Sequence, residues 1–272
     1  MPVDVQGLCD DLRAEGNELF AVLDRISPEQ WKLDTPAAGW TIADQVSHLA
    51  YFDDAATLAA TDVERFRTSA DALIARGSDF TEYVAAQYRQ RSGAELLAWL
   101  VEAREQLLAI MFTIDPSRKL PWFGPPMSPA SSLTARLMET WAHGLDIRDV
   151  LGLAPAVSTR LRHIAHLGYA TIGWSFQVHD RPLPEHPIRL ELSGPGGAAM
   201  HWGPAEADNR ISGSLLDFCL LVTQRRHAED LALDATGPVA TEYLGLAQSF
   251  AGPPGPGRAP SSVVTQPSRV DK

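Results

Sequence analysis

The first half of the chain carries apolar residues at helical spacing. Apolar side chains that recur every three or four residues mark one face of an α-helix. The pattern predicts helices over residues 3–26, 41–60, 93–114 and 129–151, with the polar segment 61–90 helical in part. Proline-containing loops at 33–40 and 115–132 separate the long helices. Four long helices joined by such loops predict a four-helix bundle over residues 1–152.

The second half combines helical and alternating patterns. Helical spacing covers 157–179, 214–226 and 238–250, whereas residues 186–194 alternate between apolar and polar as a strand does. We expect residues 196–203 to form a hairpin partner for this strand and residues 209–213 to form a third strand. The predicted fold class is therefore α+β, with a helical bundle followed by a small α+β domain at 153–251. Residues 252–272, rich in proline and glycine, are predicted to be a disordered tail.

Charge limits the partners that this chain can bind. Lys and Arg number 23 against 34 Asp and Glu, and the formal net charge is −11. Such a chain is poorly suited to nucleic-acid binding through a broad basic surface, or to an anionic membrane surface. We therefore expect no nucleic-acid and no membrane partner.

The cysteines and the N-terminus indicate the compartment. Cys9 and Cys219 are far apart and belong to no CxxC pair, so we expect neither a disulfide framework nor a zinc knuckle. The N-terminus lacks the basic and apolar regions of a signal peptide. No run of 18 apolar residues predicts a membrane span. These features predict a reduced protein in the cytoplasm.

Polar side chains form a stripe along the predicted helix 129–151. At about 100° per residue, Glu139, His143 and Asp146 lie on one side of this helix. Arg136 and Ser132 fall on the same stripe. The opposite side is apolar: Leu133, Leu137, Trp141 and Leu145. The stripe is either the solvent-exposed face of an amphipathic helix or a place where Glu139 and His143, four residues apart, point two metal ligands at one ion.

A metal site needs a further ligand. A catalytic zinc ion takes three protein ligands and keeps one open position. The best third donor is His48, in the segment "GWTIADQVSHLAYFD" at 39–53. It lies among apolar residues of the second predicted helix (Ile42, Val46, Leu49 and Phe52). A lone histidine on a helix is more often a packed or half-exposed residue than a metal ligand.

Two segments together resemble a known family. "GWTIADQVSHLAYFD" followed by "ARLMETWAHGLDIRDVLG" at 135–152 is similar to the DinB-like superfamily, and more closely to its mycothiol-dependent maleylpyruvate isomerase branch. That resemblance implies a metal-binding four-helix bundle whose ligands are His48, Glu139 and His143. Trp40 and Asp146 also match the pattern. "WGPAEADNRISGSLLDFCLLVTQRR" resembles the α+β domain that follows the bundle, and the whole chain is most similar to an actinobacterial subgroup described only as metal-binding.

The resemblance implies a function. We expect a divalent-metal-dependent enzyme with bound zinc that uses a thiol such as mycothiol as cosubstrate and acts on a small electrophilic acid, as an isomerase or as an S-transferase. Asp146 is the candidate that orients His143 or shapes the pocket, or it forms a salt bridge with Arg148 or Arg136. Asp44, one turn before His48, either accepts a hydrogen bond from that imidazole or serves only as an acid at the start of the helix.

Two other segments are candidates for ligand contact. Trp122, Phe123 and Met127 lie on a stiff loop that leads into the predicted metal-bearing helix, so they are predicted to wall a cofactor pocket above the metal, or to staple the start of the helix. Near the end of the predicted helix 214–226, Arg225 is our candidate to hold a substrate carboxylate. Neighbouring helical residues point about 100° apart, so only one of Arg225 and Arg226 would face inward. Alternatively, both arginines only favour the negative end of that helix.

Two further functions remain open from the sequence. In one, the metal supports a thiol-independent hydrolase, lyase or cyclase. In the other, the chain is a metal-binding protein without turnover, in which His163 or His166 closes the open coordination position. All three functions share the metal site, and the two enzymatic ones act on a small-molecule substrate.

Overall fold

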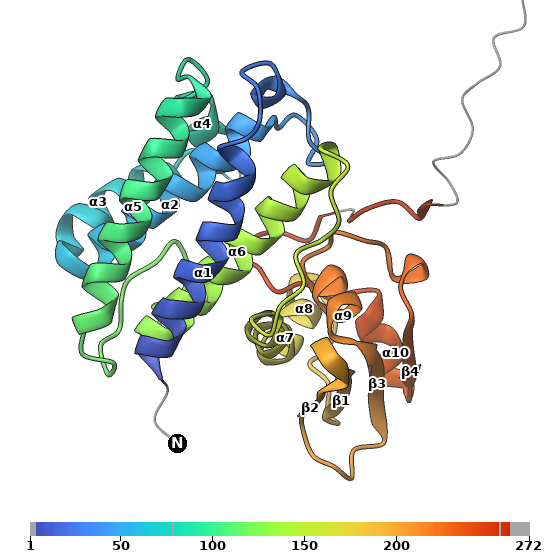
Figure 1. Cartoon of the computed structure of the whole chain (residues 1–272). Helices are drawn as coiled ribbons and strands as arrows, with labels where there is room; N and C mark the ends of the chain where they lie inside the picture. The colour runs from blue at the N-terminus through green and yellow to red at the C-terminus, as the bar shows by residue number, and fades with distance from the viewer. Residues whose placement is uncertain (1–3, 78, 256, 262–272) are drawn as a thin grey trace, which may run out of the picture. The chain divides into compact units, whose positions relative to one another are not determined.

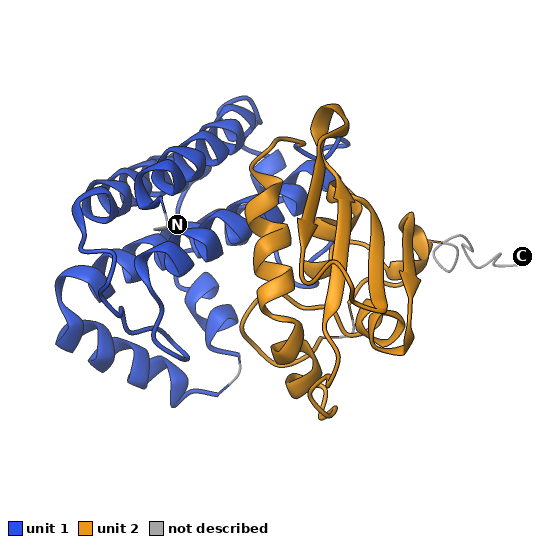
Figure 2. Cartoon of the chain, turned by 90° about the horizontal axis from the view of Figure 1, so that it is seen from below, with its two compact units in different colours: residues 1–156 blue, residues 157–272 orange. Residues whose placement is uncertain are grey.

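The computed structural model describes residues 4–77, 79–255 and 257–261, and the chain divides into two compact units. Figure 2 colours them separately, as residues 1–156 and residues 157–272. The sequence pattern predicts the corresponding boundary at residue 152. Each unit has its own secondary structure, and each is described by itself below.

Four long helices build the first unit (Figure 1): α1 (Val5–Leu23), α2 (Ile42–Thr61), α5 (Gly93–Thr113) and α6 (Pro129–Val150). α2 contacts α5 and α6, and α1 contacts the same two helices, so the predicted four-helix bundle is confirmed. The polar segment 61–90 contains two shorter helices, α3 (Val63–Ile74) and α4 (Phe80–Ala86), as predicted for a segment that is helical in part. A 3-10 turn, η1 (Gln30–Lys32), precedes α2.

Local sequence signals fix where the long helices begin. Thr41 and Asp44 form a capping box at the start of α2, in which each side chain accepts a hydrogen bond from the other's backbone N–H. Ser92 and Glu95 do the same for α5. Ser128 caps α6, and Pro129 follows at the first helical position, where its missing N–H costs nothing. These caps set the ends of the helices that carry the candidate site.

A buried arginine joins the four helices of the bundle. The Arg104 side chain on α5 is 1% exposed, and its Nε donates to Asp53 Oδ2 on α2 at 2.6 Å. Its Nη2 donates to Thr140 Oγ1 on α6 at 2.9 Å, and its Nη1 donates to the Leu12 carbonyl on α1 at 3.4 Å. Arg104, Asp53 and Thr140 are all buried, so their contacts are shielded from water.

The second unit combines a four-stranded sheet with helices. The strand order is β2-β1-β3-β4, built from β1 (Ile188–Ser193), β2 (Ala199–Trp202), β3 (Asn209–Ser214) and β4 (Leu233–Thr236). β1 pairs antiparallel with β2 and parallel with β3, and β3 pairs antiparallel with β4. The hairpin and the third strand are therefore as predicted, and the α+β fold class is confirmed.

Helices contact every strand of this sheet. α9 (Leu215–Val222) contacts β1 and β3, α10 (Pro238–Leu244) contacts β3 and β4, and α7 (Leu161–Ala170) contacts β2. A fourth helix, α8 (Ile172–Val178), follows α7. Short 3-10 turns, η2 (Pro195–Gly197) and η3 (Ala228–Asp230), lie in the connections.

The structure corrects several predicted boundaries in this unit. The helix predicted over 157–179 is two helices, because Thr171 leaves helical geometry and turns its hydroxyl onto the Leu167 carbonyl. The last helix ends at Leu244, earlier than predicted, with Gly245 as its C-cap. β4 was not predicted at all. The predicted tail falls partly outside the described residues, but Ser261 donates to the Asp230 carboxylate from its backbone N at 3.0 Å.

In the described part of the chain, no helix is both long enough and apolar enough to cross a membrane.

One close approach in the first unit gives a stability test. A Cβ added at Gly93 would lie 2.3 Å from atoms of the buried Trp31 ring, a rigid group that cannot move aside cheaply. We expect Gly93→Ala to lower the free energy of unfolding by about 1–3 kcal/mol, measured by urea denaturation. Gly124→Ala is the matched control, because no atom of the described residues lies within 4 Å of its added Cβ. Equal stability of the two variants would contradict this account.

Candidate metal centre

Three side chains from two helices of the bundle converge on one place. His48 comes from α2, and Glu139 and His143 come from α6. Potential ligand atoms of the three lie within 4.8 Å of one another. Nε2 of His143 is 3.0 Å from Glu139 Oε2, and Nε2 of His48 is 3.7 Å from the same oxygen. Two imidazoles and one carboxylate are a donor set that binds Zn²⁺ and similar divalent ions.

The polar stripe of α6 is not a solvent-exposed face. Its members Ser132, Arg136, His143 and Asp146 are all buried, and the Glu139 side chain is 24% exposed. The opposite side is buried as well: Leu133, Leu137, Trp141 and Leu145. α6 therefore has core on both sides. The prediction of a solvent-exposed polar face is wrong for this helix. The helical spacing distinguishes a polar side from an apolar side, but it does not determine whether either side is exposed.

A hydrogen-bond relay fixes the orientation of His143. The Trp40 backbone carbonyl can only accept, so the Thr35 hydroxyl donates to it at 2.7 Å. The Thr35 oxygen then accepts from Gln45 Nε2, at 2.7 Å. The amide oxygen Oε1 of Gln45 thereby faces Nδ1 of His143 and accepts its proton. The neutral imidazole therefore has its lone pair on Nε2, the nitrogen that faces Glu139.

That tautomer places two acceptors against each other. The Nε2 lone pair of His143 and the Glu139 carboxylate are 3.0 Å apart, a distance at which a cation, either a proton or a metal ion, joins the two atoms. A proton would bridge only this pair of atoms. A metal ion would also bind Nε2 of His48, the third donor around the same place. If a metal binds here, Gln45 would orient His143 as a ligand.

Neither Gln45 nor Thr35 is among the residues that the sequence predicts for the site. Gln45 lies three residues before His48, so both side chains come from one face of α2. This spacing was the available signal. Thr35 lies in a loop, and its contact with Gln45 depends on the tertiary fold.

The environment gives two of the candidate ligands the protonation states that metal binding needs. Burial, followed by the nearby His143, lowers the pKa of His48 to about 4, so this imidazole is neutral at pH 7. Burial by itself raises the pKa of Glu139, but contact with His143 and His48 outweighs it and holds that pKa well below 4.5. Neutral histidine and ionised glutamate are the ligand forms.

Aromatic rings surround the three candidate ligands. The Trp40 ring stacks on His143 at 5.9 Å between centroids, and the Phe52 ring lies 4.6 Å from His48. Trp122 and Phe123 pack against the Phe52 ring, at 6.1 and 5.4 Å. The loop that carries Trp122 and Phe123 therefore contacts the site through Phe52. Among the described residues, neither ring makes a ring contact with His48 or His143.

The hairpin-like shape of this loop explains how it is held. Leu120 and Met127 exchange two backbone hydrogen bonds, at 2.8 and 2.9 Å, which close the loop just before α6. Met127 thus contributes through its backbone, and its predicted place in a cofactor pocket stays a prediction.

The structure resolves the role of Asp44 but not that of Asp146. Asp44 accepts from Thr41 and, at 2.8 Å, from Arg89, so it is a helix-start acid. Nδ1 of His48 is buried and makes no hydrogen bond within the described residues. Asp146 is fully buried one turn beyond His143, and its predicted role stays a prediction.

Arg225 does not lie on a helix. α9 ends at Val222, and Gln224 turns the chain with a φ of 55°. Nη1 of Arg225 donates to the Thr223 carbonyl at 2.7 Å, and Nη1 of Arg226 donates to the Arg225 carbonyl at the same distance. The prediction that only one of the two arginines faces inward assumed that both lie on a helix, and that assumption is wrong. Carboxylate binding by Arg225 stays a prediction.

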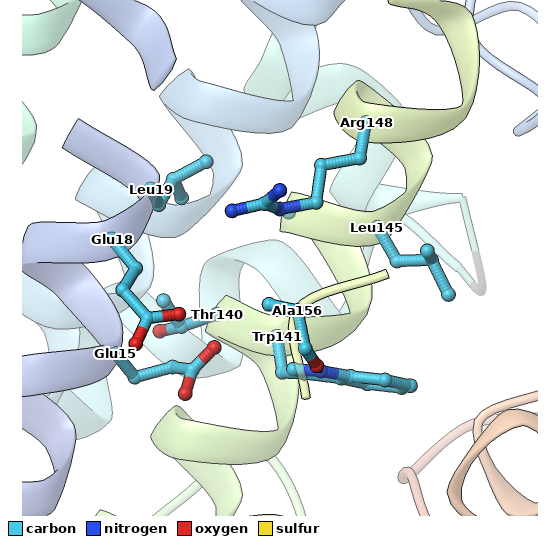
Figure 3. A pocket seen from close by; sticks show the side chains of 9 residues that line it. Glu15, Glu18, Leu19, Thr140, Trp141, Leu145, Arg148 and Ala156 are labelled. Carbon is cyan, nitrogen blue, oxygen red and sulfur yellow. The ribbon is translucent and has the colours of Figure 1, made fainter. Parts of the chain in front are cut away.

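A separate small pocket lies between α1 and α6 (Figure 3). Glu15 and Glu18 reach it from α1, and Arg148 reaches it from α6. Trp141 also lines it, on the side of α6 opposite Glu139 and His143. No imidazole lines this pocket, so its donor set differs from that of the candidate metal centre.

Comparison with known proteins gives the class and then the family. The four-helix bundle followed by an α+β unit is the architecture that the resemblance to the DinB-like superfamily implies. The family model described as "Mycothiol maleylpyruvate isomerase N-terminal domain" matches residues 12–148, half of the chain. The chain belongs to this family. A second model, described as "Wyosine base formation", matches residues 184–236.

The chain is also similar to two other proteins and to two solved structures. Two uncharacterized proteins of Mycobacterium tuberculosis, from strains CDC 1551 / Oshkosh and ATCC 25618 / H37Rv, are each 46% identical over 249 residues, or 91% of this chain and 96% of theirs. Crystal structures of the mycothiol-dependent maleylpyruvate isomerase and of its histidine-to-alanine mutant have TM-scores of 0.58 and 0.59. They are 15% and 16% identical and cover 86% of this chain and 93% of their own. At this identity the likeness is one of fold.

The relay predicts an effect of a residue that is not itself a candidate ligand. Gln45→Leu removes the acceptor that holds the proton on Nδ1 of His143. We expect zinc affinity to fall by about 10–100-fold, measured by competition with a chromophoric chelator. Gln106→Leu, at an exposed glutamine of α5, is the matched control. An unchanged affinity in Gln45→Leu would show that the relay does not prepare the ligand.

Proposed function

We propose that this protein is a divalent-metal-dependent enzyme that uses a thiol of the mycothiol type either to isomerise a small electrophilic acid or, as an S-transferase, to add the whole thiol to it. His48, Glu139 and His143 would hold the ion. Zinc fits two imidazoles and one carboxylate while keeping a position open. When bound, a divalent ion lowers the pKa of a coordinating thiol, so that thiolate is present at neutral pH.

The facing acceptors at His143 and Glu139 carry the metal part of this proposal. A cation between these two atoms, 3.0 Å apart, would satisfy both, and His48 supplies the third donor that favours a metal ion over a proton. Membership in the mycothiol maleylpyruvate isomerase family supports the thiol part. A thiolate that adds to an activated carbon–carbon double bond leaves a single bond free to rotate. Elimination of the thiolate then restores the double bond in the other geometry.

The chain's own residues would hold the reactants and exclude water. Trp40 and Phe52 flank the imidazoles and limit the access of bulk solvent. Trp122, Phe123 and Met127 are proposed as a pocket wall for the thiol, with Asp146 shaping the same pocket. Arg225 is proposed to bind the substrate carboxylate, since a guanidinium can do so with two parallel hydrogen bonds.

Metal content tests the ligand set directly. We expect untagged wild-type protein to contain about one equivalent of divalent metal by mass spectrometry, and Glu139→Ala and His143→Ala to contain almost none, because two ligands hold the ion weakly. His166→Ala, at an exposed histidine of α7, is the control and should keep its metal. A wild type without metal, or ligand variants that keep it, would overturn the proposal. Loss of metal in His166→Ala would instead make that histidine a ligand.

Thiol dependence separates the proposal from its alternatives. We expect metal-loaded protein to convert a cis-unsaturated keto acid only when mycothiol is present, because the thiolate is the nucleophile. The reaction is followed by absorbance, with the Glu139→Ala protein as the control. Turnover without thiol would indicate a hydrolase, lyase or cyclase. Bound metal without turnover on any electrophilic acid tested would indicate a binding protein.

A further inference from the structure

A buried arginine lies on the same stripe as the candidate metal ligands. Arg136 precedes Glu139 by three residues on α6, so the two side chains are neighbours along one face of the helix. The Arg136 side chain is 4% exposed. Its guanidinium carbon lies 5.8 Å from the centroid of the Phe52 ring, and the same ring lies 4.6 Å from the His48 ring. Arg136 and His48 thus share an aromatic neighbour.

The guanidinium of Arg136 has hydrogen-bonding capacity that the protein does not use. Its Nε and Nη2 atoms are buried, and neither makes a hydrogen bond within the described residues. The nearest carboxylate contact is Nε to Asp53 Oδ1, at 3.7 Å, which exceeds a hydrogen bond. Unsatisfied buried donors on a charged group are costly. Their presence here therefore calls for a partner.

Asp53 does not fill this role, because another arginine already holds it. Arg104 takes the Asp53 Oδ2 atom at 2.6 Å and completes its own contacts with Thr140 and Leu12. One carboxylate thus faces two buried guanidinium groups, and one positive charge in this cluster is left over. Glu139 does not balance it either once its carboxylate binds a metal. The buried environment beside the candidate metal centre is therefore suited to an added anion.

We propose that Arg136 binds a carboxylate of the substrate at the buried end of the site, beside the metal. The ligand class is a small acid with two negative groups a few ångströms apart, one for the metal and one for the guanidinium. A planar guanidinium can take a carboxylate through its Nε and Nη2 atoms as a parallel pair. Arg136 is thereby a specificity-determining residue within the first unit, independent of Arg225.

This inference rests on the proposed function, since it assumes a metal at the neighbouring ligands. The probe is a matched pair of small acids. Succinate has two carboxylates, whereas monomethyl succinate has a similar carbon chain and only one charge. Each is titrated into zinc-loaded, full-length protein and followed by calorimetry. We expect the wild type to bind succinate about 10–100-fold more tightly, the range that charge-assisted hydrogen bonds provide.

The variants separate anion binding from a structural role. Arg136→Met should keep its zinc by mass spectrometry and lose the preference for succinate, while Arg136→Lys should keep part of it. Arg136→Gln removes the charge, keeps a polar group at the same place and leaves the buried Asp53–Arg104 pair intact, so it guards against unfolding of Arg136→Met. If Arg136 has only a structural role, a variant that keeps the wild-type melting temperature would also keep the succinate preference. Our proposal expects that preference to be lost even where the melting temperature is unchanged.

Each failure has its own signature. A wild type that binds zinc but does not distinguish the two acids overturns this inference and leaves the metal proposal standing. Arg136→Met protein that retains the succinate preference overturns it as well. A wild type that binds no zinc overturns the proposed function. The same titration is then run on the metal-free protein, where a succinate preference lost in Arg136→Met would still support anion binding, and no preference would contradict it.

Discussion

The contact between Arg104 and Asp53 is the interaction on which the bundle depends. A single guanidinium reaches Asp53 on α2, Thr140 on α6 and the Leu12 carbonyl on α1 from its own place on α5. Removing one partner of such a buried pair typically costs about 3–5 kcal/mol, because the other charge stays behind unpaired. Hydrophobic packing alone tolerates small sliding of helices, whereas these directional contacts fix their register.

Register matters because the candidate site is divided between two helices. His48 belongs to α2, and Glu139 and His143 belong to α6. Asp53 lies five residues after His48 on α2, and Thr140 is the neighbour of Glu139 on α6. The contacts that fix the helices are thus within about a turn of the residues that would hold a metal. The buried contacts of Arg104 that stabilise the core therefore also position the candidate ligands.

The sequence predicted the bundle, the sheet hairpin and the three converging side chains. The family resemblance supplied the pairing of His48 with Glu139 and His143, since no local pattern states which helices become neighbours. Burial of the α6 stripe was not predictable, because periodicity describes one helix and burial depends on its surroundings. Gln45 and Thr35 were missed for the same reason. The failure at Arg225 was local: Gln224 adopts a positive φ that no apolar pattern signals.

In the relay from Trp40 to His143, each hydrogen bond fixes which atom donates in the next one. The 33–40 loop therefore determines the tautomer of His143. Trp40 supplies the carbonyl that sets the Thr35 hydroxyl, and its ring also stacks over His143. A displacement of residues 33–40 would therefore do two things together. It would expose the imidazole and release the amide that selects its tautomer. The position of this loop thus determines which nitrogen of His143 bears the proton. Covering the imidazole and leaving its Nε2 lone pair available to a ligand partner therefore depend on the same residues.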